Sequence, residues 1–181
     1  MLNRVRVLAA ILPLAAVLGG CLYEATIDAK GGAEVKVHYR VDPNTKIEKV
    51  TADLESKDVK LVSKSIDKDH YVDATLQTAD VMKLPTTPYF RTTTIGLTDG
   101  PDKGTKKLSI RYANKSPNIK LPQNALDYYG AQLKVVLNLP GEVVASNATE
   151  TKGASVTWAF DTSKFFAAKE TTLEVTYKLA K

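Results

Sequence analysis

The strongest constraint on the fold is a repeated pattern of paired strand-like segments, each pair separated by a short turn sequence. In residues 33–41, AEVKVHYRV, the apolar side chains Val35, Val37 and Tyr39 alternate with polar ones, as in a strand with one buried face. Residues 22–28 precede this segment, and the glycines of AKGG between them suit a tight turn. The same arrangement recurs at 59–66 with 71–78 and at 89–97 with 106–113. The pattern therefore predicts three hairpins and an antiparallel sheet.

Short helices are expected after these hairpins. Asp42 and Pro43 are typical of a helix N-cap and first turn. Ile47, Val50 and Leu54 follow at helical spacing, so we predict a helix of about three turns that begins at Asp42. Shorter helices are predicted near residues 80–84 and 122–129.

The C-terminal part repeats the strand pattern around one more helix. Residues 132–141 predict a central strand that ends at a Pro-Gly turn, and residues 154–160 predict its neighbour. Asp161 predicts the cap of a short helix, and residues 171–180 predict a closing strand. We therefore expect residues 21–181 to form a single α+β domain, with a largely antiparallel sheet of hairpins and short helices packed on one face.

The N-terminal residues have the organisation of an export signal. Arg4 and Arg6 precede an apolar stretch, residues 7–18, with no acidic residue before Glu24. This stretch is too short to cross a bilayer as a helix, which takes about 18 or more apolar residues. The segment therefore predicts a signal peptide and not a permanent membrane span.

Leu18, Gly19, Gly20 and Cys21 resemble a bacterial lipobox, with a branched apolar residue three positions before the cysteine and small residues between. Such a site implies cleavage after Gly20 and a thioether on Cys21 that carries diacylglycerol. Two or three acyl chains, palmitate among them, give lasting attachment because each buried CH₂ contributes about 0.8 kcal/mol. We therefore expect loss of residues 1–20, export, and lipid anchoring in the bacterial cell membrane or outer membrane. The alternative is an ordinary buried cysteine beside a simple signal peptide.

Charge and residue inventory argue against several function classes. Residues 1–20 hold two arginines and no acidic residue, so the net charge of +5 falls to +3 for residues 21–181. The sequence lacks the Lys/Arg stripe of a nucleic-acid-binding protein. His38 and His70 have no histidine or cysteine partner at metal-ligand spacing, and no nucleophile-elbow sequence surrounds a serine. We expect no catalytic residues, no metal, no cofactor and no nucleic-acid partner, and we do not expect an enzyme.

Aromatic doublets are the better indication of a binding surface. Six aromatic residues form three doublets, which are candidate ligand or interface residues: Tyr89 with Phe90, Tyr128 with Tyr129, and Phe165 with Phe166. Each doublet lies at the edge of a predicted element or on a short helix. In a strand a doublet points to both faces, so one ring enters the core and its neighbour stays out. Outer rings of this kind would line a groove or press on the bilayer. The alternative is that the outer rings only cover loops. Trp158 alternates with Val156 and Phe160 and is expected in the core.

Residues 135–160, VVLNLPGEVVASNATETKGASVTWAF, resemble the C-terminal signature of the LppM-type bacterial lipoprotein domain. The matching features are an apolar strand, a Leu-Pro-Gly turn, a Ser-Asn pair and Val-Thr-Trp; Cys21 and the early IDAKGGAEVKV hairpin extend the likeness. The resemblance implies an exported, membrane-anchored α/β module with no accepted catalytic role that handles lipid or another envelope component. Members often continue into a C-terminal transmembrane helix, whereas this sequence reaches Lys181 directly after a predicted strand, so lipid is the expected attachment.

Two function classes remain. The first is a noncatalytic envelope binding module for lipid or another apolar component. The alternative is a structural or assembly lipoprotein that docks another envelope protein, of unknown identity, through a sheet edge or exposed rings. A binder should contain an apolar cavity of a few hundred Å³, whereas a docking protein should have a filled core and an exposed apolar patch. The sequence favours the binding module.

Overall fold

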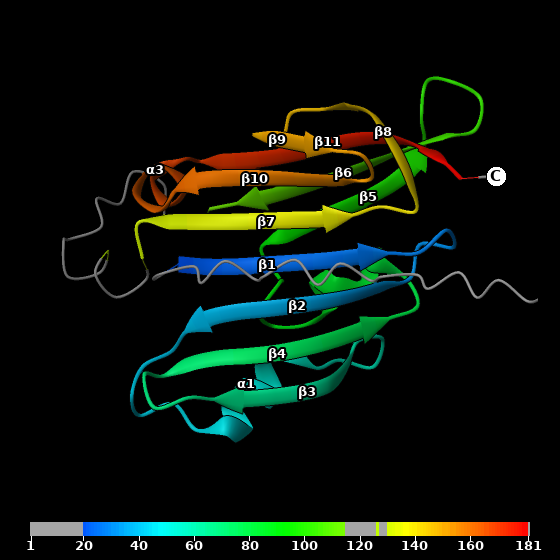
Figure 1. Ribbon diagram of the computed structural model, residues 1–181. Helices are drawn as coiled ribbons and strands as arrows, with labels where there is room; N and C mark the ends of the chain where they lie inside the picture. Colours follow the sequence, from blue (N-terminus) through cyan, green and yellow to red (C-terminus); the bar gives the residue numbers. More distant parts are fainter. Residues whose placement is uncertain (1–19, 115–125, 127–129, 181) are drawn as a thin grey trace, which may run out of the picture.

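The computed structural model describes residues 20–114, 126 and 130–180, which form two β-sheets and three short helices (Figure 1). The large sheet has the strand order β3-β4-β2-β1-β7-β10-β9, and the small sheet has the order β5-β6-β11-β8. The strands are β1 (Gly20–Ile27), β2 (Ala33–Arg40), β3 (Lys60–Ile66), β4 (Tyr71–Thr78), β5 (Thr93–Asp99), β6 (Thr105–Ala113), β7 (Gln132–Asn138), β8 (Gly141–Ser146), β9 (Glu150–Lys152), β10 (Ser155–Asp161) and β11 (Glu170–Leu179). The predicted α+β class, with largely antiparallel pairing, is confirmed.

The three predicted hairpins are present as β1–β2, β3–β4 and β5–β6. In the first, the turn closes because Asp28 Oδ1 accepts hydrogen bonds from the backbone N–H groups of Lys30 and Gly32, at 2.7 and 3.0 Å. Gly31 in this turn has a φ of +91°, a conformation that residues with a Cβ rarely adopt. The AKGG segment therefore forms the tight turn that its glycines indicate.

The third hairpin begins later than predicted. Residues 89–92 form a turn, and β5 starts at Thr93. The backbone N–H of Tyr89 donates to Asp53 O at 2.9 Å, and that of Thr93 donates to Phe90 O at 2.8 Å. These bonds hold the Tyr89-Phe90 doublet in a turn, outside the strand. The two rings therefore do not have to point to opposite faces of the sheet.

A parallel pair lies at the centre of the large sheet. β1 runs parallel to β7, with Cys21 opposite Leu133 and Ala25 opposite Leu137. This pair joins the first hairpin to the C-terminal strands, so sequence-distant segments share one sheet (Figure 1). Side-chain alternation predicts a strand but not its partner, and for that reason the sequence did not indicate this pairing.

The segment after Leu139 is more ordered than the predicted turn and loop. β8 pairs with β11 in the small sheet, and β9 pairs with β10 in the large sheet. A Cβ on Gly141 would lie 1.8 Å from the backbone oxygen of Lys178, so this close approach of β8 to β11 requires glycine. The chain therefore passes from the large sheet to the small one immediately after β7.

Asn147 connects the two sheets through its side chain. Its Oδ1 accepts hydrogen bonds from Trp158 Nε1 on β10 and from the backbone N–H of Glu174 on β11, both at 2.8 Å. Its Nδ2 donates to the backbone oxygen of Thr172, also at 2.8 Å. One amide group therefore satisfies three partners on two different sheets.

We expect Asn147→Ala to lower the free energy of unfolding by about 2 kcal/mol, because three partners lose a hydrogen bond and one of them is the indole of a buried tryptophan. Asn44→Ala is the matched control, since Asn44 is exposed and its side chain bonds locally to Asp42. Urea denaturation of both variants would measure the difference. Equal stability of the two variants would show that Asn147 does not hold the sheets together.

The helices are short, and the first begins later than predicted. α1 spans Ile47–Leu54 with Lys46 at its N-cap, so the predicted start at Asp42 is wrong. Asp42 instead accepts the backbone N–H of Asn44 at 2.8 Å and stabilises a turn ahead of the helix. No helix among the described residues is long and apolar enough to cross a bilayer.

The other two described helices are capped by aspartates. Asp80 caps η1 (Val81–Thr86), a 3₁₀ helix, and its side chain accepts from Met82 N. Asp161 caps α3 (Thr162–Ala167), and its Oδ1 accepts from Lys164 N at 3.0 Å, as the sequence predicted. The helix predicted near residues 122–129 lies outside the described residues except at residue 126.

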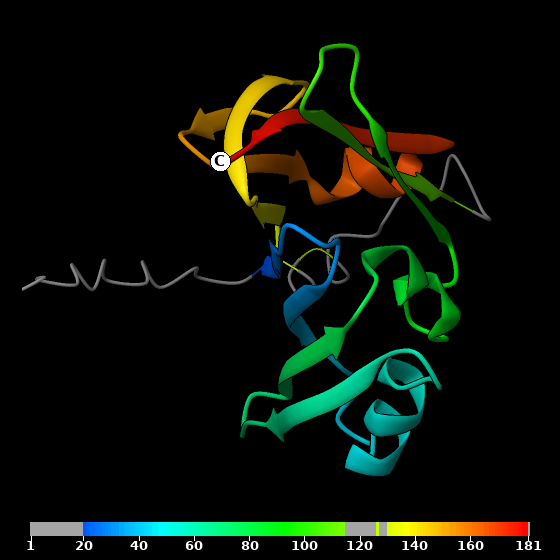
Figure 2. The ribbon, with the colours of Figure 1, turned by 90° about the vertical axis from the view of Figure 1, so that its right-hand side faces the viewer.

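The core lies on one side of the large sheet. Figure 2 shows the small sheet, η1 and α1 on that side, and buried residues from all of these elements form one apolar cluster. Trp158 is 2% exposed and Val156 is 1% exposed, while Phe160 packs against the cluster. The predicted burial of Trp158 is therefore confirmed. On the opposite face of the large sheet, Lys36 and Asp73 are exposed.

Candidate apolar binding site

A cavity of about 310 Å³ lies between the large and small sheets. Its walls are mostly aliphatic and aromatic, with Ala25, Val35, Leu133, Val135 and Leu137 from the large sheet and Ile95, Ile110 and Leu173 from the small sheet. Aromatic side chains complete it from the turn before β5 and from α3. The core is therefore not filled where the two sheets face each other.

The first aromatic cluster consists of Tyr23, Tyr39, Tyr89 and Phe90. The ring of Tyr89 lies between those of Tyr39 and Phe90, with centroids 4.7 and 5.0 Å away. Tyr23 approaches both Tyr89 and Phe90 at 6.3 and 6.4 Å, within the usual range for aromatic pairs. Three of these rings, those of Tyr23, Tyr89 and Phe90, line the cavity.

The second aromatic cluster consists of Tyr112, Phe160, Phe165 and Phe166. Phe165 on α3 is its centre, with centroid distances of 4.8 Å to Tyr112, 5.4 Å to Phe160 and 5.6 Å to Phe166. Tyr112, Phe165 and Phe166 line the cavity. The position of α3, fixed by its Asp161 cap, thus places two aromatic rings on the cavity wall.

The two aromatic clusters differ in their polar groups. In the first, the hydroxyl oxygens of Tyr23 and Tyr89 lie 2.7 Å apart and share a hydrogen bond. Burial raises the pKa of both hydroxyls well above the ordinary tyrosine value. In the second, burial raises the pKa of Tyr112, and a hydrogen bond with Thr92 partly offsets the rise. All three tyrosines are therefore neutral hydroxyl groups at physiological pH.

The cavity wall carries no positively charged side chain among the described residues. Glu24 contributes to the wall, but its side chain alternates to the opposite face of β1. There its Oε1 accepts a hydrogen bond from Asn138 Nδ2 at 3.0 Å, and it borders a surface groove with Lys36 and His38. The cavity therefore offers apolar contacts and neutral hydroxyl groups.

The structure brings two of the three predicted doublets to one place. Tyr89, Phe90, Phe165 and Phe166 are all half-buried and line the cavity. Neither doublet lies in a strand, so the alternation of a strand does not decide which of their rings face the core. Tyr128 and Tyr129 lie outside the described residues.

Sequence reasoning did not single out Tyr23 and Tyr112, which also line the cavity. The available signal was alternation: Tyr23 shares a strand face with Cys21 and Ala25, and Tyr112 shares one with Ile110. Alternation shows that such residues face inward. It does not show whether their surroundings are filled.

Cys21 lies within β1, and its side chain is on the same face as Tyr23. The thiol is half-buried and unpaired with any other cysteine. Burial raises its pKa, and a hydrogen bond with the backbone of Arg40 partly offsets the rise. Because Cys21 itself pairs with Leu133, no spacer separates it from the sheet. Of the other predicted lipobox residues, Leu18 and Gly19 lie outside the described residues.

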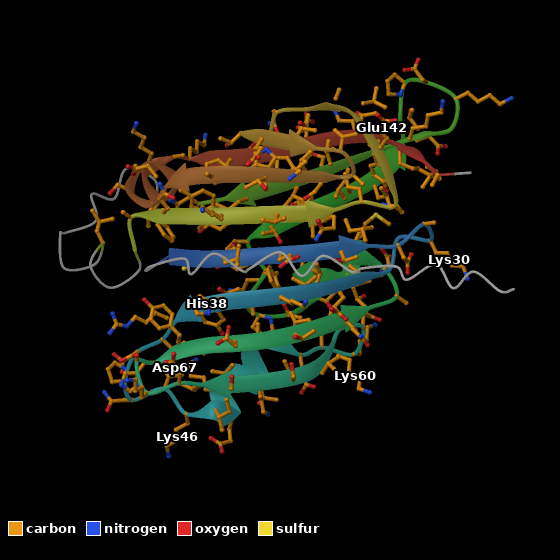
Figure 3. All side chains as sticks on the ribbon, viewed as in Figure 1. Lys30, His38, Lys46, Lys60, Asp67 and Glu142 are labelled. Carbon is orange, nitrogen blue, oxygen red and sulfur yellow. The ribbon has the colours of Figure 1, made fainter. Side chains whose placement is uncertain are left out.

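The start of β1 lies at the α3 end of the cavity. Gly20 and Asp161, the α3 cap, both lie opposite Gln132 on β7. Cys21 lies opposite Leu133, which is part of the cavity wall. Lys30 lies in the turn at the other end of β1, far from the Asp67 turn (Figure 3). The segment proposed to carry the lipid anchor therefore adjoins the aromatic end of the cavity.

The histidines lie away from the cavity. His38 Nδ1 lies 2.8 Å from Asp73 Oδ1, and its ring stacks on Tyr71 with centroids 4.8 Å apart. His70 lies in the turn before β4 with a φ of 63°. Among the described residues, no three His, Cys, Asp or Glu side chains gather where they could hold a metal ion.

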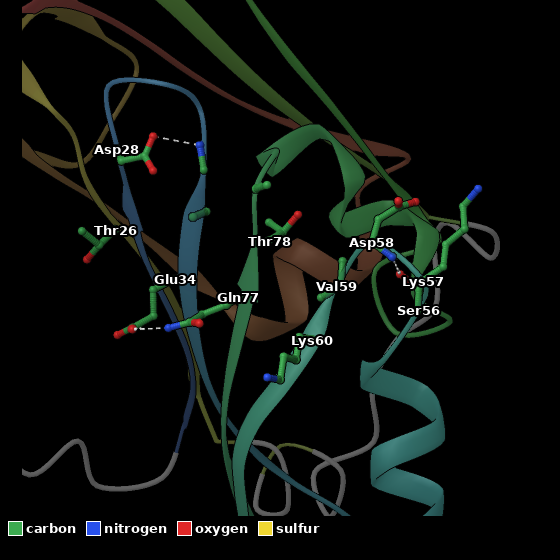
Figure 4. Close-up of a pocket in the computed structure, with 13 residues that line it drawn as sticks. Thr26, Asp28, Glu34, Ser56, Lys57, Asp58, Val59, Lys60, Gln77 and Thr78 are labelled. Carbon is green, nitrogen blue, oxygen red and sulfur yellow. Dashed lines mark hydrogen bonds between the residues drawn. The ribbon is translucent and has the colours of Figure 1, made fainter.

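A larger depression, about 630 Å³, lies at the surface between the β1–β2 turn and the start of β3 (Figure 4). It is lined largely by polar side chains. Gln77 Nε2 donates to Glu34 at 3.3 Å, and Asp28 closes its own turn. Val59 is one of its few apolar residues. We do not regard this depression as a site for an apolar ligand, because it is open to solvent and few apolar residues line it.

No protein-family model matches this sequence, and no curated protein sequence matches it. The NMR structure of the folded domain of the LppM protein from Mycobacterium tuberculosis is similar, with a TM-score of 0.55 and 15% sequence identity. The likeness covers 90% of this chain and 92% of that chain. At this identity the comparison shows the fold alone. The protein therefore has an LppM-like fold, which agrees with the resemblance seen in the sequence.

Proposed function

We propose that this protein is a membrane-anchored bacterial lipoprotein that acts as a noncatalytic envelope binding module for a lipid or another apolar component. The apolar cavity between the sheets carries the proposal. Its volume of about 310 Å³ is at the lower end of the usual range for ligand pockets, about 300–1,000 Å³. A cavity of this size suits part of one acyl chain better than a complete membrane lipid.

The surface of the molecule favours the binding module over the docking alternative. The large apolar side chains that are exposed among the described residues are Val62, Met82 and Val144. They belong to three different elements, β3, η1 and β8. Isolated exposed residues of this kind are common on soluble domains and do not indicate an interface.

The proposed anchor places the cavity near the membrane. Because Cys21 is itself part of β1, a lipid on Cys21 would hold the sheet directly against the bilayer. The α3 end of the cavity would then face the membrane, and Lys30 would point away from it. Such an orientation suits a module that takes up or senses an apolar envelope component without a long transfer through water.

A cavity-filling variant tests the proposed binding function. Ala25 lies opposite both Val35 and Leu137, and all three residues line the cavity. We expect Ala25→Phe to weaken binding of diphenylhexatriene, an uncharged hydrocarbon probe, by at least about tenfold, because the added ring occupies the cavity. Probe fluorescence in titrations of the full chain would measure this.

Ala159→Phe is the matched control, since Ala159 is exposed on the opposite face of the large sheet. It should bind the probe like the unchanged protein. If the unchanged protein does not bind the probe, or if Ala25→Phe binds it equally well, the cavity is not a binding site.

A further inference from the structure

The hydroxyl pair in the first aromatic cluster has one hydrogen more than its own contact uses. Tyr23 and Tyr89 each carry one O–H donor, and their 2.7 Å contact uses one of the two. Within the described part of the chain, neither hydroxyl has a second hydrogen-bond partner. Both residues line the cavity, and Tyr89 also borders a surface pocket with Lys49 and Asp53, so one donor is available at the boundary of the cavity.

A partly buried donor without an acceptor is unfavourable, and a ligand that supplies an acceptor removes this penalty. Burial keeps both hydroxyls protonated, because it raises the pKa of each tyrosine. The pair is therefore a permanent neutral donor and not a switchable charge. Its position within an aromatic and aliphatic wall means that the acceptor must arrive on an apolar chain.

The lack of a positive charge in the cavity wall limits which chemical groups can serve as the acceptor. Among the described residues no lysine, arginine or histidine lines the wall, so a carboxylate or phosphate would be buried without a counter-charge, which is strongly unfavourable. An alcohol or a protonated acid brings a hydrogen of its own, which a tyrosine or threonine oxygen of the wall would have to accept. An ester carbonyl brings an acceptor and no donor, and this matches the single spare hydrogen.

We propose that the cavity takes an acyl chain in the form of a neutral ester, whose carbonyl oxygen accepts a hydrogen bond from the Tyr23–Tyr89 hydroxyl pair. This inference rests on the proposed binding function and specifies its ligand class. The chain lies against Ala25, Val135 and Ile110, and the ester lies at the first aromatic cluster.

Three probes of equal chain length test the inference: methyl laurate, methyl dodecyl ether and laurate, each used at about pH 8 to displace diphenylhexatriene from the full chain. The ether lacks the carbonyl, and laurate is ionised at this pH. We expect methyl laurate to bind about tenfold more tightly than either of the others, as one additional hydrogen bond implies.

The double variant Tyr23→Phe/Tyr89→Phe removes both hydroxyls and keeps both rings. We expect it to bind the ester and the ether equally well. Each single variant keeps one hydroxyl, whose hydrogen is then free for the ligand, so each should retain a preference for the ester. Tyr177→Phe is the control, since Tyr177 is buried on β11 and does not line the cavity.

The outcomes separate this inference from the function on which it rests. If the three probes bind with equal affinity, or if the double variant keeps the preference for the ester, the inference is overturned and the binding module stands. If none of the probes and no diphenylhexatriene binds, the proposed function fails as well. Urea denaturation of each variant checks that a loss of binding does not reflect unfolding.

An ester-linked acyl chain could come from a separate lipid or from the diacylglyceryl group proposed on Cys21. Cys21 lies opposite Leu133 on the cavity wall, so both sources lie within reach of the cavity. Methyl laurate binding to the lipidated chain and to Cys21→Ser distinguishes them. If both forms bind methyl laurate equally well, the cavity takes a separate lipid. If Cys21→Ser binds methyl laurate and the lipidated protein does not, the acyl group on Cys21 already occupies the cavity. Either result supports the ester chemistry.

Discussion

Replacing Trp158 by alanine is expected to lower the free energy of unfolding by about 3–5 kcal/mol, which is a large part of the stability of a domain of this size. The indole is 2% exposed and lies opposite Val135 on β7. Its removal leaves a void beside the cavity and breaks the hydrogen bond from Nε1 to Asn147. Urea denaturation, followed by circular dichroism because the variant lacks tryptophan, would measure the change.

Trp158→Phe separates packing from hydrogen bonding at this position. It keeps a large ring and loses the N–H donor, so we expect a loss of about 1–2 kcal/mol. Because the chain has one tryptophan, the emission spectrum of the unchanged protein reports on this site alone. A spectrum typical of an indole in water, together with a small loss of stability in Trp158→Ala, would contradict the position of Trp158 in the core.

Replacing Cys21 by serine is expected to leave the protein without lipid and to abolish its partitioning into the detergent phase. Cys21 is the chain's one cysteine, and each buried CH₂ of an attached acyl chain contributes about 0.8 kcal/mol to membrane affinity. Detergent phase separation of cells that express each form would show the difference. Intact-mass measurement of the unchanged protein should show the added diacylglyceryl group.

Leu22→Ser is the control for this prediction. It makes a similar polar substitution at the adjacent residue of β1 and leaves the thiol in place, so it should remain in the detergent phase. If Cys21→Ser also remains there after loss of residues 1–20, Cys21 is an ordinary half-buried cysteine and the lipobox interpretation is wrong.

The sequence predicted the local parts of this fold well. The alternation in residues 33–41 and the glycines before them predicted the first hairpin. Burial of one strand face and formation of a tight turn both depend on residues close in the sequence. Asp161 likewise predicted the start of α3, since its side chain caps Lys164 three residues away. These elements depend on interactions between residues close in the chain.

Long-range features could not be obtained in the same way. β1 pairs with β7, which lies more than a hundred residues away in the sequence. β8 joins the small sheet by pairing with β11, about thirty residues away. Asp42 shows a different limit: its side chain fits a turn as well as a helix cap, and the turn is present. Local pattern alone does not choose between them.

The candidate site was predicted only in part. The doublets at residues 89–90 and 165–166 lie at the cavity, but the sequence did not indicate that they lie close to each other. Tyr23 had no feature to distinguish it from any inward-facing strand residue. The residues around the cavity follow the same alternation as residues of a filled core.

Native mass spectrometry of the full chain, purified from bacterial membranes in mild detergent, would show whether the cavity between the sheets holds an apolar envelope molecule. We expect the unchanged protein and Ala159→Phe to carry a lipid-sized mass that dissociates on activation, and Ala25→Phe to lack it. The absence of such a mass from the unchanged protein, or its equal retention by Ala25→Phe, would contradict the proposed binding function.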